Sequence, residues 1–159
     1  MRGIPGLAED GAVERDDRVG AEHERAGHSQ RLAARVLGRD RARLAGRQLL
    51  DGAILGKPRD AAQATEYLAR LAGRTHEVVG GIALARDGEL LAEAVEVTEV
   101  TFRALSADEV GDYVAVGEWE GRAGGYAIQG RGAALVRSIS GDYLNVVGLP
   151  LARLLDLLH

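Results

Sequence analysis

The sequence contains no cysteine, three prolines and few aromatic residues, which occupy 4% of its 159 positions. Without cysteine the chain can form neither a disulfide framework nor a thiolate metal site. It also lacks an uninterrupted apolar run of about 18 residues and an apolar leader, which argues against a membrane or secretory protein. Apolar residues nevertheless make up 46% of the chain. We therefore expect a cytoplasmic protein with an interior of Leu, Val, Ile and Ala.

An excess of positive charge is absent as well, because the net charge is −4. A protein that follows the phosphate backbone of a nucleic-acid polymer is normally basic, so we expect no such polymer as partner. A length of 159 residues suits about one domain. Homodimers are common among small oligomeric proteins, so a homodimer is one candidate assembly, and the sequence does not determine the oligomeric state.

Lysine is almost missing: Lys57 is the only one among twenty basic side chains. Its ammonium is a compact point charge that can follow a phosphate, whereas the guanidinium of arginine is a planar fork, so the two are not interchangeable at a tight anionic site. Lys57 is therefore a candidate phosphate or carboxylate ligand. The alternative is a solvated surface lysine after a turn.

The composition changes near residue 47. Residues 1–47 contain ten of the nineteen arginines and eight acidic residues but few Val, Ile or aromatic residues, and nothing in them predicts a strand. A weak apolar stripe predicts a helix from about Ser29 to Leu44, and the charged stretch before it favours disorder. We therefore expect an atypical arginine-rich segment over 1–47 and a folded domain over 48–159.

From Leu49 onward the pattern is typical of an α/β domain. Asp51-Gly52 suits a tight turn, and Asp60 is placed to cap a helix that ends at Gly73. Residues 78–84 and 90–102 predict two antiparallel strands joined at Asp87-Gly88.

Later segments continue the alternation of helices and strands. Ser106 and Glu109 form a capping-box pattern that predicts a helix ending at Gly117, and residues 134–139 predict another strand. Pro150 fits the first turn of a last helix. The stripe expected to be buried on that helix consists of Leu151, Leu154, Leu155 and Leu158.

Residues 117–132 contain six glycines among charged and amide side chains. Such a loop lets a ligand approach the backbone, and Gln129 offers a donor and an acceptor to a nucleobase edge. The alternative is an ordinary turn, in which Glu118 and Arg122 form a solvated ion pair. Trp119 fits either the core or a stacking contact with a base.

Four segments carry a resemblance to the Maf family of nucleoside triphosphate pyrophosphatases, in its branch acting on dTTP and UTP. They cover roughly two thirds of the chain in the family's order. The segments are Asp51-Gly52-Ala53-Ile54-Leu55-Gly56-Lys57-Pro58, Gly73-Arg74-Thr75-His76-Glu77-Val78-Val79, Gly117-Glu118 with Ala123-Gly124-Gly125-Tyr126-Ala127-Ile128-Gln129-Gly130, and Gly141-Asp142-Tyr143-Leu144-Asn145-Val146-Val147-Gly148-Leu149-Pro150-Leu151.

The resemblance implies a mixed twisted sheet flanked by helices, and hydrolysis of a nucleoside triphosphate to its monophosphate and pyrophosphate. It also implies a divalent cation, Mg or Mn, acting at the α-phosphate. Lys57 matches the family's phosphate-binding lysine and Gln129 its base-reading glutamine. Glu118 and Arg122 match the acidic and basic positions of the loop between them.

The chain departs from the family pattern where the chemistry is expected. No strand ending in a Ser-x-Arg-Arg loop is found in residues 1–47, and Arg47 stands where the family has an aspartate that serves as base and metal ligand. An arginine can neither accept a proton nor hold a cation. Gly80 replaces a threonine. The catalytic base and the metal ligands therefore remain unassigned.

These departures leave three functional readings. The first is a pyrophosphatase acting on dTTP, UTP and related pyrimidine nucleotides. The second is a catalytically impaired nucleotide-binding or regulatory remnant, with an altered or misread beginning joined to an intact Maf-like remainder. The third is a generic α/β scaffold, which would require all four matching segments to be coincidence.

Overall fold

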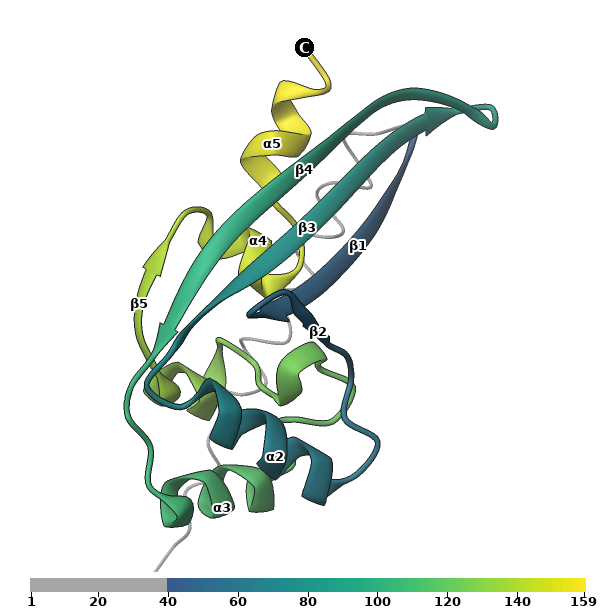
Figure 1. Cartoon of the computed structure of the whole chain (residues 1–159). Helices are drawn as coiled ribbons and strands as arrows, with labels where there is room; N and C mark the ends of the chain where they lie inside the picture. Colours follow the sequence, from purple (N-terminus) through teal and green to yellow (C-terminus); the bar gives the residue numbers. More distant parts are fainter. Residues whose placement is uncertain (1–39) are drawn as a thin grey trace, which may run out of the picture.

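The computed structural model describes residues 40–159, with side chains from residue 46 onward. One five-stranded sheet, in the order β2-β1-β3-β4-β5, forms its centre. Helices α2 and α3 lie beyond one end of the long strands, and α4 and α5 lie against the sheet (Figure 1). The expected α/β class is confirmed. Every ladder between the described strands is antiparallel, so the mixed sheet implied by the resemblance is not found in residues 40–159.

Strand β1 (Asp40–Leu50) corrects two sequence predictions. It pairs antiparallel with β3 from Asp40 to Leu49 and with the short β2 (Ala53–Leu55). The predicted helix therefore does not extend to Leu44, and the region before residue 47 does contain a strand. The rest of that helix and the charged stretch lie outside the described residues. Pairing along β3 is the physical reason, because strand formation depends more on the neighbouring strand than on intrinsic propensity.

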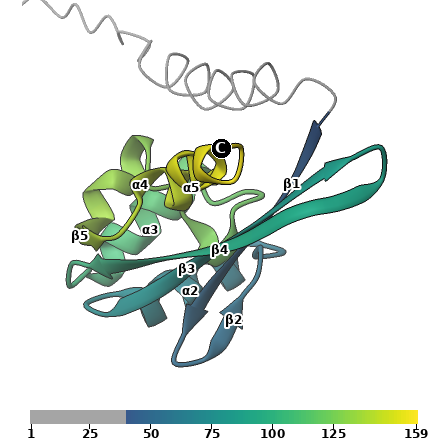
Figure 2. The same ribbon diagram turned by 90° about the horizontal axis from the view of Figure 1, so that it is seen from above.

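The long hairpin of β3 (Thr75–Arg86) and β4 (Glu89–Phe102) is confirmed. Asp87 and Gly88 both have positive φ, at 50° and 92°, as a two-residue hairpin turn requires. Burial alternates along β3, and its inward positions are His76, Val78, Gly80, Ile82 and Leu84. Helices α4 and α5 lie on one side of this hairpin (Figure 2).

Helices α2 (Ala61–Leu71) and α3 (Ala107–Val116) begin at the predicted caps. The Asp60 side chain accepts a hydrogen bond from the Gln63 backbone N–H at 2.8 Å. Ser106 and Glu109 form the predicted capping box, and Gly117 ends α3 with a φ of 81°. The Asp60 cap, the capping box and Gly117 are thus three local sequence signals that mark ends of these helices as predicted.

The C-terminal part differs in detail from the prediction. Strand β5 (Val136–Ser140) starts two residues later than expected, because residues up to Leu135 form a 3₁₀ turn. An unpredicted short helix, α4 (Tyr143–Val147), precedes α5 (Leu151–Asp156). On α5 Leu154 is buried, but Leu155 is 39% exposed, so the predicted buried stripe is wrong at that residue.

Two clusters of buried side chains form the described core. The larger one joins the sheet to α2, α3 and the glycine-rich segment, with Phe102, Leu68 and Tyr126 among its members. The smaller one places Ile82 and Leu84 of β3 against Leu149 and Leu154. Within residues 40–159 no helix is long and apolar enough to cross a membrane.

Candidate functional site

The glycine-rich segment is folded into two 3₁₀ turns, η1 (Ala123–Gly125) and η2 (Gly130–Leu135). Glu118 supports the second turn, because its carboxylate accepts hydrogen bonds from the backbone N–H groups of Arg131 and Gly132, each at 3.1 Å. The Ala127 N–H donates to Tyr113 Oη at 3.0 Å. These contacts define the path of residues 126–129 and give Glu118 a local role in holding the backbone.

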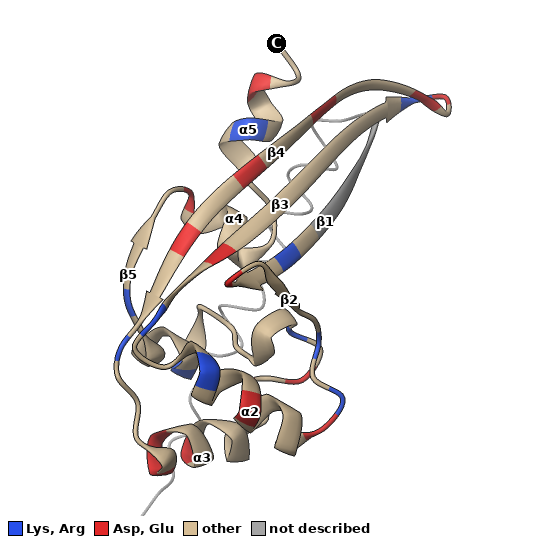
Figure 3. Ribbon diagram, in the orientation of Figure 1, with Lys and Arg blue, Asp and Glu red and all other residues tan. Residues whose placement is uncertain are grey.

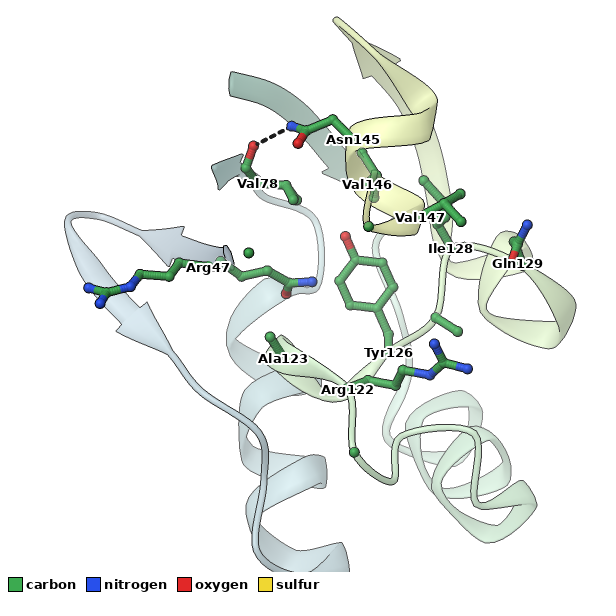
Figure 4. A pocket seen from close by; sticks show the side chains of 15 residues that line it. Arg47, Val78, Arg122, Ala123, Tyr126, Ile128, Gln129, Asn145, Val146 and Val147 are labelled. Carbon is green, nitrogen blue, oxygen red and sulfur yellow. Dashed lines mark hydrogen bonds between the residues drawn. The ribbon is translucent and has the colours of Figure 1, made fainter. Parts of the chain in front are cut away.

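A cavity of about 170 Å³ lies between this segment, the end of β1 and α4 (Figure 4). Its walls are Gly46, Arg47, Gln48, Val78, Gly121, Arg122, Ala123, Tyr126, Ala127, Ile128, Gln129, Asn145, Val146, Val147 and Gly148. Aliphatic and aromatic groups dominate this lining, and three amide side chains add hydrogen-bonding capacity. Such a combination is typical of a site for a small organic ligand.

The cavity brings together Gln129 and Arg122 from the sequence-predicted set, and Arg47, which stands in place of the family's aspartate, also lines it. The Arg122 guanidinium and Gln129 lie on the same side of Tyr126, whereas the Arg47 guanidinium points the other way (Figure 4). Arg122 and Arg47 are both exposed. The structure therefore places basic groups at the rim of a largely apolar hollow.

Lys57 and Glu118 are not part of the cavity wall. Lys57 is exposed on the connection between β2 and α2. The neighbouring Gly56 carbonyl accepts a hydrogen bond from the Gly124 N–H at 3.0 Å. The Lys57 connection thus contacts the η1 turn, whose residue Ala123 lines the cavity. The lysine lies outside the hollow, on a segment attached to its wall.

Gln48 and Asn145 were missed by the sequence reasoning. Gln48 is 7% exposed and its Oε1 has no hydrogen-bond partner among the described residues. Asn145 is 3% exposed, and its Nδ2 donates to the Val78 carbonyl at 3.0 Å and to Thr98 Oγ1 at 3.1 Å. Asn145 therefore ties α4 to the two central strands. Asn145 belongs to a segment quoted for the resemblance, but no local pattern indicates that either amide is buried.

Tyr126 forms the wall of the cavity that faces the core. Its hydroxyl shares a hydrogen bond of 2.8 Å with His76 Nε2, and its ring packs edge-on against His76 and Phe102. Burial raises the pKa of Tyr126 and lowers the pKa of His76 to about 4. Both groups are therefore neutral at neutral pH, and they give the wall a fixed, uncharged surface.

The described residues do not fit the divalent cation that the resemblance implies. The cavity wall contains no Asp, Glu or His, and residues 40–159 hold no group of three such side chains able to bind a metal. Mg²⁺ and Mn²⁺ prefer carboxylate and other oxygen ligands. The acidic side chains on β4 include Glu93 and Glu99, which are exposed and absent from the cavity wall (Figure 3).

Comparison with other sequences identifies similar proteins. The chain is 49% identical over 110 residues to a dTTP/UTP pyrophosphatase of Pyrococcus furiosus, covering 69% of this chain and 57% of the relative. It is 53% identical over 111 residues to one of Symbiobacterium thermophilum, covering 69% and 56%. The corresponding Salmonella typhimurium protein is 52% identical over 110 residues, covering 69% and 55%. The chain thus spans little more than half the length of these relatives.

The resemblance proposed from four short segments is confirmed over a longer range. The sequence profile of the family described as Maf-like protein matches residues 8–159. That range includes both walls of the cavity. The chain belongs to the Maf family.

Proposed function

We propose that this protein hydrolyses dTTP and UTP to the nucleoside monophosphate and pyrophosphate. The observation that carries the proposal is the cavity, which combines an apolar interior, three amides and arginines at its rim. This composition suits a nucleobase inside and phosphates outside. Relatives at about 50% identity bear the name dTTP/UTP pyrophosphatase, which supports the choice of substrate.

In the proposed reaction, water attacks the α-phosphorus, the bond from that phosphorus to the oxygen bridging the α- and β-phosphates breaks, and pyrophosphate leaves. The protein's main task is then to hold the triphosphate and to neutralise charge. We assign Lys57 and Arg122 to the phosphates and Gln129 to the base. Glu118 acts through the backbone of η2, which it holds by two hydrogen bonds.

A second candidate is a nucleotide-binding or regulatory remnant with impaired catalysis. It is favoured by one observation: the cavity wall contains neither carboxylate nor histidine, and Arg47 lies there. A site that binds nucleotide without a general base would lose about 10²- to 10⁴-fold in rate. This candidate predicts binding without release of pyrophosphate.

The remaining expectations extend the proposal. The family resemblance assigns a divalent cation, Mg or Mn, to the reaction, and the described residues do not identify its ligands. A cytoplasmic location and a homodimer are the settings that we propose for this enzyme. Light scattering during size-exclusion chromatography measures the oligomer, and a monomer mass would contradict the dimer.

Pyrophosphate release from dTTP, UTP and CTP, with magnesium or manganese added, tests the proposed function. We expect release from dTTP and UTP, and at least a tenfold loss in Lys57→Ala, because one charge-assisted contact to phosphate contributes about 1.5–3 kcal/mol. Lys57 is exposed, so its replacement should leave the melting temperature unchanged.

Each alternative outcome has a distinct meaning. Nucleotide binding without release from the wild-type chain would support the remnant. Release that is unaffected in Lys57→Ala would contradict the assignment of Lys57 to phosphate. A fall in melting temperature without weaker binding would make Lys57 a structural residue.

A further inference from the structure

We infer that Gln48 contacts the pyrimidine ring of the nucleotide, at N3 and the substituent on C4, and helps to determine which base is accepted. This inference rests on the proposed function, because it assumes that the cavity receives a nucleobase. Neither the family resemblance nor the relatives' names point to Gln48. The evidence for this role is the burial of Gln48 and its position in the cavity wall.

The size and lining of the cavity select the base as the part of the nucleotide that enters. About 170 Å³ is well below the roughly 300–1,000 Å³ that pockets for whole organic ligands occupy. One ring fits this volume better than an entire nucleoside triphosphate. The interior side chains Val78, Tyr126, Ile128 and Val147 carry no charge at neutral pH, whereas triphosphate oxygens require cations.

Gln48 and Asn145 of this wall both have a buried amide oxygen without a hydrogen-bond partner among the described residues. Gln48 is 93% buried, since only 7% of its surface is exposed. A buried, unpaired amide oxygen costs about 1–3 kcal/mol. An amide in a cavity wall recovers part of this cost when a ligand gives the group a partner.

The environment of Gln48 lets it present either end of its amide. Its Oε1 lies close to Gly124, where a Cβ atom would come within 1.6 Å of the oxygen. This oxygen has no hydrogen bond to lose when the amide rotates by 180°. Gln48 can therefore offer an acceptor or a donor to the cavity.

These properties match the polar edge of a pyrimidine. Uracil and thymine present an N3–H donor beside the O4 acceptor, whereas cytosine presents the N3 acceptor beside an amino donor. An amide pairs with either edge, in opposite orientations. A carboxylate accepts hydrogen bonds only, so Gln48→Glu should favour the cytosine amino group and repel O4 of uracil.

The test measures binding and hydrolysis separately. Gln48→Leu should weaken binding of UMP, and raise the KM for UTP, about tenfold, with kcat changed less than twofold. Gln48→Glu should lower the preference for UTP over CTP by a similar factor. The matched control is Gln63→Leu, at a half-buried amide on α2 that is outside the cavity wall. This control should leave both parameters unchanged.

The outcomes separate this inference from the proposed function. If the wild type releases no pyrophosphate but binds UMP, and Gln48→Leu weakens that binding, the inference holds and the proposed function fails. If UTP is hydrolysed while Gln48→Leu and Gln48→Glu bind UMP and CMP like the wild type, the inference is wrong. Failure of the wild type to bind UMP also overturns it.

A measurement on the wild-type protein covers the case in which the variants do not fold. The side-chain amide signal of Gln48 in a ¹⁵N-correlated NMR spectrum should shift during titration with UMP, while that of Gln63 stays in place. An unchanged Gln48 signal at saturating UMP would contradict the contact.

Discussion

Gly46 and Gly80 face each other across the β1–β3 ladder but differ in their surroundings. A Cβ atom on Gly80 would come within 1.9 Å of Asn145 Oδ1, whereas one on Gly46 would meet nothing within 4 Å. The absence of a side chain at Gly80 is thus a condition for the buried position of Asn145. The threonine that the family resemblance expects at this position would carry its Cβ into the same space.

We predict that Gly80→Ala lowers the free energy of unfolding by about 1–3 kcal/mol, because overpacking displaces Asn145 from its hydrogen bonds to β3 and β4. Gly46→Ala is the matched control and should change stability by less than about 0.5 kcal/mol. Urea unfolding of both variants measures the difference. Equal stabilities would show that α4 adjusts without cost.

Individual site residues differ in how far the sequence predicts them. Gln129 and Arg122 are indicated by a glycine-rich motif, and the structure places both at the cavity. Gln48 and Asn145 owe their burial to contacts with η1 and with the central strands, which are distant in sequence. No local pattern encodes such contacts. The position of Lys57 outside the cavity wall also cannot be predicted from a local pattern, because it depends on how β2 connects to α2.

At the scale of elements, the capping box of α3 is the most direct test of a local signal. The Glu109 N–H donates to Ser106 Oγ at 3.2 Å, and the Ser106 N–H donates to Glu109 Oε2 at 2.8 Å. Ser106→Ala removes the first bond, and we predict a loss of about 1 kcal/mol in the free energy of unfolding. Thermal or urea unfolding measures this loss.

Ser138→Ala is a suitable control for that experiment. Ser138 is exposed on β5, so its hydroxyl should contribute little to stability. The hydrogen bond from the Ser106 backbone, followed by that from Arg103, lowers the pKa of Glu109. The ionised Glu109 carboxylate therefore stabilises the folded state at pH values above the ordinary carboxyl pKa. This stabilisation is lost as the pH falls through the lowered pKa of Glu109. Similar losses in both serine variants would contradict the capping role.

Elements with local signals were predicted well, and those without them were not. The β3–β4 hairpin and the caps of α2 and α3 follow from turn and cap residues. Strand β1 was missed because its arginine-rich sequence lacks strand character, although β3 supplies a complete pairing partner for residues 40–49. Helix α4 was missed because it contains only five residues. Tertiary pairing and short length are thus the physical causes of these two omissions.

At the scale of the whole molecule, His76 links the stability of the fold to pH. Its side chain is 2% exposed, and burial lowers its pKa from the ordinary 6.5 to about 4. Between these values the unfolded chain binds a proton that the folded chain does not. Folding stability should therefore fall as pH decreases through this window, by about 1.4 kcal/mol per unit at most.

We predict that His76→Gln reduces the loss of stability between pH 7 and pH 5 by about 2 kcal/mol relative to the wild type. Glutamine keeps a group that can hydrogen-bond the Tyr126 hydroxyl, but it does not titrate. The control is His159→Gln, a replacement of a histidine that is exposed at the C-terminal end. Urea unfolding of the wild type and both variants at the two pH values measures the loss of stability in each protein.

The carboxylates of the chain also titrate in acid, but they are common to all three proteins, so the comparison isolates the contribution of His76. If His76→Gln and the wild type lose equal stability, then His76 accepts its proton in the folded state at an ordinary pKa. Protonation would then have to be accommodated beside Tyr126 and Phe102, where the ring now packs. Because Tyr126 lines the cavity, that result would also make the wall of the proposed base site sensitive to pH.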